Sequence, residues 1–174
     1  MTERDVFLPV GSGWALDDIA AVAAEAEELG YDRVWLPETW GRDAVTTLAV
    51  VAERTDEVGV GTGIAPVYSR SPALLGQTAA TLQEASGGRF RLGLGPSGPV
   101  VVERWHGVDY GNPLKRTREA IEATKRVLDG DVVEYDGETA SMSGFRLRQG
   151  APEPTPPVDA TGMGPKATEL AGRF

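Results

Sequence analysis

Hydrophobic and polar positions repeat with two different periods in the central part of the chain. Residues 58–64 alternate β-branched side chains with glycines, a two-residue period that predicts a strand. Residues 72–86 repeat apolar side chains every three or four positions, which predicts a helix with Pro72 in its first turn and Gly87 after its end. Residues 89–94 predict a second strand. A strand, a helix and a strand in this order form a βαβ unit, whose two strands pair in parallel.

The same strand and helix patterns continue on both sides of this unit. Further strands are predicted over residues 5–10, 32–36 and 158–162, and further helices over 15–29, 44–54, 114–128 and 165–174. Residues 99–112 predict a loop or short helix, and 131–147 predict a small β-hairpin around an Asp-Gly turn. The repeat indicates an α/β fold with a parallel sheet in one domain, residues 1–174. A complete (β/α)8 barrel of the TIM type needs about 250 residues, so we expect only about its first five β/α units, a partial barrel.

Composition removes several classes of function. The chain has no cysteine and one histidine, so disulfides and thiolate chemistry are excluded and we expect no metal site. A net charge of −9 argues against nucleic acid as a partner. Neither an apolar run of the roughly 20 residues that cross a bilayer nor a signal peptide is present, so we expect a cytoplasmic protein without a membrane partner.

Acidic residues outnumber basic ones, and few of the basic residues are lysines. Aspartate and glutamate total 26, whereas only Lys115, Lys125 and Lys166 are lysines. An acidic surface with few lysines is expected of a halophilic protein, and a GC-rich genome would also favour arginine over lysine. Both explanations remain open.

The sequence GLGPSG at residues 93–98 matches the dinucleotide-binding pattern G-x-G-x-x-G. Pro96 and Pro99 interrupt the helix that should follow, and no acidic residue ends a next strand at the required distance. A glycine-rich strand end is therefore the better interpretation. Because ligands bind at the carboxyl ends of parallel strands, its backbone amides remain candidates for binding a phosphate.

A serine hydrolase is disfavoured, since Ser97 lacks the second glycine of a nucleophile elbow and His106 is the only imidazole. His106 is better explained as a structural residue. Trp35, in the middle of a strand, is predicted to lie in the core, whereas Trp40, Tyr68 and Trp105 follow strand ends, where aromatic side chains often line a pocket. Glu38, just after the second strand, is either a solvated loop acid or a group at the mouth of the barrel.

Five runs of sequence carry a family resemblance: ELGYDRVWLPET, VGVGTGIAPVYSRSPALLGQTAATLQEASGGRFRLGLG, RWHG, PLKRTREAIEATKRVLDG and GPKATELAG. Together they span nearly the whole chain in order. They resemble the bacterial-luciferase-like superfamily, and most closely its deazaflavin-dependent branch, exemplified by methylenetetrahydromethanopterin reductase. The resemblance implies a (β/α)8 barrel whose mouth binds 8-hydroxy-5-deazaflavin (coenzyme F420) or, as an alternative, FMN.

The resemblance also implies a cofactor site. In the family a non-proline cis peptide, here Gly63-Ile64, forms a ridge with the following residue, Ala65, against the back of the tricyclic ring. Ser97 and Gly98 match the loop whose amides approach the cofactor tail, and Ala160, Thr161 and Gly162 match a segment that packs along the cofactor.

Glu38 matches the position of a catalytic carboxylate near the reactive edge of the ring. The family usually has aspartate there, often followed by a histidine that is Thr39 in this chain, and this difference puts a role as proton donor in doubt.

The implied activity is hydride transfer between a reduced deazaflavin and a small organic substrate, such as a methylene-tetrahydropterin. Two alternatives remain: an FMN-dependent luciferase-like monooxygenase, and a truncated, non-catalytic remnant or interaction module. Members of the family commonly pair, so a homodimer is a further expectation.

Overall fold

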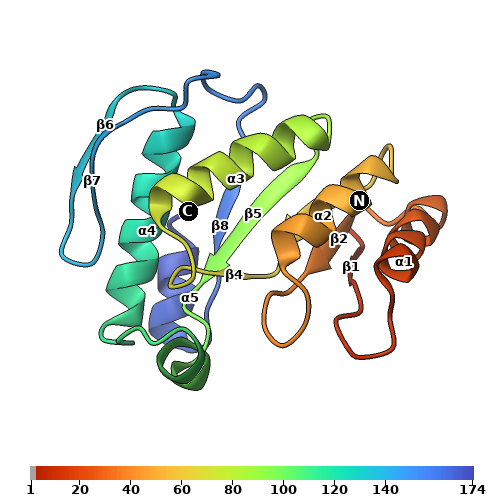
Figure 1. Cartoon of the computed structure of the whole chain (residues 1–174), viewed down its shortest axis with the longest axis horizontal. Coiled ribbons are helices and arrows are strands. Elements are labelled where there is room, and N and C mark those ends of the chain that lie inside the picture. The colour runs from red at the N-terminus through yellow and green to blue at the C-terminus, as the bar shows by residue number, and fades with distance from the viewer. Residues whose placement is uncertain (1–2) are drawn as a thin grey trace.

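The computed structural model describes residues 3–174 and shows an α/β fold built on a parallel sheet (Figure 1). The strands of this sheet are β1 (Asp5–Phe7), β2 (Arg33–Leu36), β3 (Gly59–Thr62), β4 (Ala65–Pro66), β5 (Phe90–Gly95) and β8 (Val158–Ala160). They follow the order β1-β2-β3-β5-β4, and β8 also pairs with β5. Every pair in this sheet is parallel, which confirms the predicted topology.

An α-helix follows β1, β2, β4, β5 and β8 along the chain. These helices are α1 (Leu16–Glu28), α2 (Ala44–Glu53), α3 (Pro72–Ala85), α4 (Pro113–Leu128) and α5 (Pro165–Ala171). The side chains of Asp43, Ser71 and Asn112 accept hydrogen bonds from the first turns of α2, α3 and α4, so each of these helices begins at a capping residue. A single π-helical turn, η1 (Val100–Trp105), occupies the segment predicted as a loop or short helix.

The predicted β-hairpin is present as β6 (Val133–Asp136) and β7 (Ser141–Phe145), which pair only with each other. Its turn lies against α4, because the buried Glu119 carboxylate accepts hydrogen bonds from the main chain of Thr139 and Ala140. In Figure 1 the hairpin lies beside α4, at the side of the molecule away from α1.

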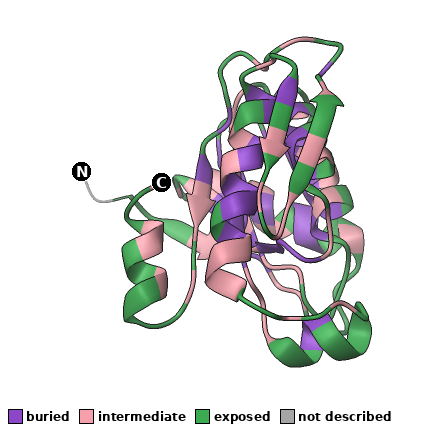
Figure 2. Cartoon of the chain, turned by 90° about the vertical axis from the view of Figure 1, so that its left-hand side faces the viewer, coloured by how far each residue is buried: buried purple, intermediate pink, exposed green. Residues whose placement is uncertain are grey.

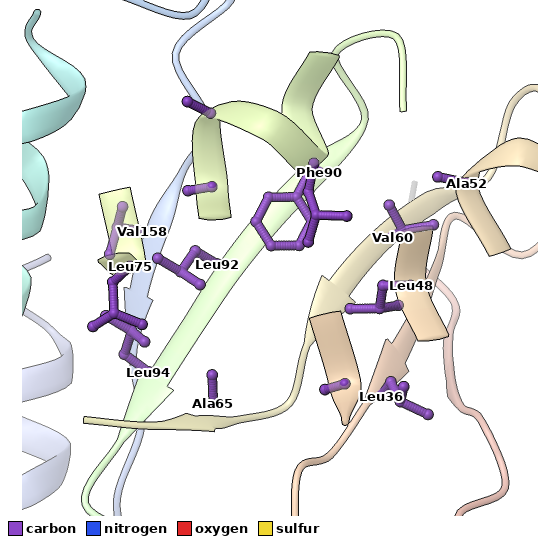
Figure 3. Close-up of a cluster of buried hydrophobic side chains, with 14 of the residues drawn as sticks. Leu36, Leu48, Ala52, Val60, Ala65, Leu75, Phe90, Leu92, Leu94 and Val158 are labelled. Atoms are coloured by element: carbon purple, nitrogen blue, oxygen red, sulfur yellow. The ribbon is translucent and has the colours of Figure 1, made fainter. Parts of the chain in front are cut away.

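The helices and the sheet enclose the main hydrophobic core. Alternate strand residues point toward the helices and are buried, among them Val34, Val60, Phe90, Leu92 and Leu94. Figure 3 shows Val60, Phe90, Leu92 and Leu94 in one cluster with Leu48 of α2 and Leu75 of α3. In Figure 2 the buried residues gather between helices and strands, whereas the outer loops are exposed.

The other face of the sheet carries glycines and charged residues together with the rings of Phe7 and Trp35, which are neighbours in register on β1 and β2. Trp35 lies there and is only partly buried, so its predicted place in the core was wrong. Its ring covers Gly61, where a Cβ would lie 2.5 Å from Trp35 Cζ3, and its Nε1 donates to the carboxylate of Asp5 at 2.8 Å. The helix-facing positions of β2 are Val34 and Leu36 instead, because side chains alternate along a strand.

The strand predicted over residues 58–64 is also shorter than expected. Residues 63 and 64 break it, and the chain resumes pairing with β5 only at β4. Within residues 3–174, the helices all lack the length and apolar character that crossing a membrane requires.

Candidate functional site

The predicted cofactor residues come together where the parallel strands end. Ala65 pairs with Leu94, Ala160 pairs with Leu94 from the other side, and the N–H of Thr161 donates to the carbonyl of Leu94 at 2.9 Å. Segments separated by almost one hundred residues in sequence therefore share one strand end, where the arrowhead of β5 points in Figure 1. This is the edge at which α/β proteins bind ligands.

The peptide bond between Gly63 and Ile64 is cis, as predicted. The residues on both sides of this bond are held by main-chain hydrogen bonds to the end of β2. The N–H of Gly63 donates to Leu36 at 3.0 Å, and the N–H of Glu38 donates to the carbonyl of Ile64 at 3.1 Å. The segment thus keeps contact with β2 although it leaves the regular sheet.

Glycines let the main chains approach one another closely at this edge. A Cβ on Gly93 would lie 2.1 Å from the carbonyl oxygen of Thr62, and a Cβ on Gly95 would lie 3.1 Å from that of Thr161. The Thr62 hydroxyl also donates to the carbonyl of Gly93 at 2.8 Å and accepts from its N–H at 2.9 Å. The result is a surface made largely of backbone, over which the side chain of Ile64 lies, since a Cβ on Gly95 would be 3.3 Å from Ile64 Cγ1.

Two tyrosines position the loop that contains Ser97 and Gly98. The Tyr110 hydroxyl donates to the carbonyl of Ser97 at 3.0 Å, and Ser97 has a left-handed backbone with φ of 56°. Tyr68 stacks on Tyr110 with ring centroids 5.4 Å apart and donates its hydroxyl to the carbonyl of Tyr110. Burial is the main cause that raises the pKa of Tyr68 to about 12, so this hydroxyl stays protonated at neutral pH.

The Glu38 side chain is already engaged by its neighbours. Arg70 donates from Nη1 to Oε1 at 2.6 Å and from Nη2 to Oε2 at 2.9 Å, and the N–H of Ala44 donates to Oε2 at 3.2 Å. Only 16% of the Glu38 side chain is exposed. The catalytic role assigned to Glu38 stays a prediction, and any proton transfer there would require rearrangement of this ion pair.

Sequence reasoning missed Arg70. It also contacts Asp43, with Nη2 2.6 Å from Oδ2, and so joins two acidic residues of the loop between β2 and α2. Burial alone would lower the pKa of Arg70, but the hydrogen bonds and charges of Glu38 and Asp43 outweigh it and raise the pKa. Burial likewise opposes ionisation of Asp43, yet hydrogen bonds from Thr46 and the charge of Arg70 hold the pKa of that carboxyl below its ordinary value.

The aromatic residues after the strand ends differ in how far they are buried. Tyr68 is buried and lines a cavity of about 320 Å³ beside the first turn of α3. Trp40 and Trp105 touch edge to face, with centroids 4.3 Å apart, but their side chains are 77% and 43% exposed. His106 is exposed too. Among residues 3–174, no cluster of acidic or histidine side chains has a composition suited to a metal ion.

Comparisons with known proteins agree with this architecture. The chain belongs to the luciferase-like monooxygenase family, whose model matches residues 2–174. It is 36% identical to the 5,10-methylenetetrahydromethanopterin reductase of Methanolobus tindarius over 155 residues, covering 88% of this chain and 47% of that protein. It is 35% identical to the enzyme of the same name from Archaeoglobus fulgidus over 150 residues, covering 86% and 44%. The chain therefore spans about half the length of these relatives.

Solved structures share the fold. The coenzyme F420-dependent tetrahydromethanopterin reductase of Methanopyrus kandleri superposes with a TM-score of 0.87 at 24% identity, covering 99% of this chain and 53% of that one. The oxygenating constituent of 3,6-diketocamphane monooxygenase from Pseudomonas putida, solved with FMN, gives a TM-score of 0.79 at 17% identity, covering 92% and 51%. At such identities the likeness concerns the fold alone.

Proposed function

We propose that this chain binds 8-hydroxy-5-deazaflavin at the carboxyl edge of its parallel sheet and serves a deazaflavin-dependent oxidoreductase reaction. The observation that carries the proposal is the convergence of residues 63–65, 97–98 and 160–162 around the end of β5. The name of a sequence relative supports the same cofactor: the chain is 44% identical over 108 residues to a putative coenzyme F420-dependent oxidoreductase of Mycobacterium tuberculosis, covering 62% of this chain and 31% of that protein.

The residues at this edge fit a flat, tailed cofactor. The main-chain contact at Gly93 leaves no room there for a Cβ and the contact at Gly95 is tight, so neither position carries a side chain that would project toward a ring. A Cβ on Gly98, in contrast, would meet nothing within 4 Å, so the loop at residues 97–98 has open space for an extended tail. The N–H groups of such a loop are donors suited to the phosphate of a tail.

When bound, the deazaflavin would supply the hydride-transferring carbon. Gly63, Ile64 and Ala65 would support one face of the ring and leave the other face to the substrate, while Ala160, Thr161 and Gly162 flank it. The contribution of the protein is then orientation and exclusion of water from the reacting face. A small electrophilic compound, such as a methylene-tetrahydropterin, is the proposed substrate.

The second candidate is an FMN-dependent monooxygenase. It is favoured by the shared fold of the Pseudomonas putida monooxygenase that was solved with FMN. The same backbone surface would accept an isoalloxazine ring, so a direct comparison of the two cofactors is the decisive experiment.

Fluorescence titration of the purified chain with deazaflavin and with FMN tests the proposal. We expect saturable binding of deazaflavin in preference to FMN. Gly98→Val should weaken binding at least tenfold, because the new side chain would enter the open space beside the loop. Gly11→Val is the matched control, since a Cβ on Gly11 would also meet nothing within 4 Å and Gly11 lies outside the proposed site. If neither cofactor binds, the proposed function of this chain is wrong.

A further inference from the structure

Arg70 is the centre of a cluster that connects two separate loops at the carboxyl edge. It lies between β4 and α3, whereas its partners Glu38 and Asp43 lie in the loop between β2 and α2. Only 12% of the Arg70 side chain is exposed. Its planar guanidinium uses both terminal nitrogens on Glu38, an arrangement that fixes direction as well as distance.

The first turn of α2 offsets the excess negative charge of the cluster. One guanidinium faces two carboxylates, and the N–H groups of Ala44 and Thr46 donate to Glu38 and Asp43 at 3.2 and 2.7 Å. These N–H groups belong to the first turn of α2, where the helix dipole favours negative charge. Both acidic side chains are therefore held in place by donors from α2 as well as by Arg70.

The cluster reaches the proposed cofactor surface through the main chain of Glu38. While the carboxylate of Glu38 is fixed by Arg70, its N–H donates to the carbonyl of Ile64 at 3.1 Å. Residues 37–43 are thus attached at one side to Arg70 and at the other to the segment that would support the ring. Trp40 lies in the same loop and touches Trp105 of η1.

We propose that Arg70 is a positioning residue that holds residues 37–43 against Ile64, and that Glu38 acts on the site through this attachment and its main chain. The part of this inference that concerns the cofactor rests on the proposed function; the part that concerns the attachment does not. Lysine should replace Arg70 only partly, because a single ammonium cannot contact both oxygens of Glu38 and the carboxylate of Asp43 in this flat geometry.

Hydrogen exchange of the ligand-free chain tests the attachment. We expect Arg70→Met to accelerate exchange of the Glu38 and Gly63 amides at least tenfold relative to the amide of Val34, with an intermediate effect for Arg70→Lys. Arg89→Met is the matched control, because Arg89 is also a partly buried arginine, bonded to the carbonyls of Ala52, Thr55 and Val58, but it precedes β5 at the opposite edge of the sheet.

Equal acceleration in the Arg70→Met and Arg89→Met chains, or none at Glu38 and Gly63 in the former, would show that Arg70 contributes only general stability and would overturn the inference. This result does not depend on any cofactor. Failure of the attachment is therefore distinguishable from failure of the proposed function, which appears as absence of deazaflavin binding in the unaltered chain.

The induced circular dichroism of bound deazaflavin tests the consequence for the site. We expect Arg70→Met to weaken binding at least tenfold and to reduce the dichroism per bound ring, and Arg89→Met to leave both unchanged at a temperature where all variants are folded. An unchanged signal in the Arg70→Met chain, together with unchanged affinity, would contradict the proposed positioning role.

Discussion

The two faces of the parallel sheet are formed by the same strands but carry different kinds of residue. Toward the helices, β5 presents Phe90, Leu92 and Leu94, all nearly inaccessible to water. Toward the other face it presents Arg91, which pairs with Asp159 of β8, and glycines. One face therefore contributes burial of apolar area, the main source of stability, and the other contributes shape and charge at small energetic gain. Substitutions should separate these two contributions.

The largest effect is expected on the helix-covered face. Leu92 is fully buried, and Leu92→Ala should lower the free energy of unfolding by about 2–5 kcal/mol through lost burial and a residual cavity. Trp35→Ala, on the other face, should lower the free energy of unfolding by a smaller amount, although it removes a larger side chain, because Trp35 is partly exposed. Urea unfolding of both variants measures the difference, and equal losses would contradict the distinction between the faces.

Close packing gives the second test. A Cβ on Gly76 of α3 would lie 2.2 Å from Val127 Cγ1 of α4, so Gly76→Ala should destabilise by about 1–3 kcal/mol despite the better helix propensity of alanine. Gly61→Ala should destabilise the fold by a smaller amount, since the ring of Trp35, which the new Cβ would meet, can move toward solvent. Thermal unfolding checks both, and the loss caused by Gly76→Ala should be smaller in a Val127→Ala chain than in the unaltered chain, whereas the loss caused by Gly61→Ala should be the same in both.

A buried carboxylate on the helix-covered side predicts a pH effect. Burial alone would raise the pKa of Glu119, but hydrogen bonds from Thr139 and Ala140 outweigh it and lower the pKa below the ordinary value of 4.5. Because the pKa is lower in the folded than in the unfolded state, this stabilisation is present above pH 4.5 and is lost as the pH falls through the folded-state value.

Glu119→Gln should therefore lower the free energy of unfolding by about 1 kcal/mol at neutral pH. Below about pH 5, its melting temperature should decline less steeply with falling pH than that of the unaltered chain. Glu134→Gln provides a control, since the Glu134 carboxylate lies on the exposed side of the hairpin and accepts a single bond, from Gly144. Parallel pH curves for the Glu119→Gln and unaltered chains would contradict the assignment.

The smallest effect is expected for the ion pair on the open face. The side chains of Arg91 and Asp159 are 33% and 37% exposed, so Asp159→Asn should change stability by about 0–1 kcal/mol. The difference should shrink at roughly 1 M salt, where the screening length is about 3 Å. A loss as large as that of Leu92→Ala would show that the open face contributes to stability in the same way as the core.

The periodic pattern of the sequence predicted most of the fold. In the helices, apolar residues that face the sheet recur between exposed polar residues, and in the strands, apolar residues that face the helices alternate with residues of the open face. The pattern misplaced Trp35, since an aromatic residue in a strand favours a core position until the direction of each side chain is known. It also carried β3 on through residues 63 and 64 and did not predict β4, because the alternation of residues 58–64 continues through the point where main-chain pairing shifts.

At the site, the resemblance located the cis bond at Gly63-Ile64, whereas Arg70 had no local signal. Its partners lie 27 and 32 positions away, and only the packing of the two loops brings them together. An arginine beside the cap of α3, with two acids in the loop after β2, could have suggested a search for such a pair. The distances themselves depend on tertiary structure.

The outer strands of the sheet, β1 and β8, are each three residues long. A neighbouring molecule that approached either edge could form only a few main-chain hydrogen bonds before reaching loop or helix. Short edges of this kind limit strand-to-strand polymerisation.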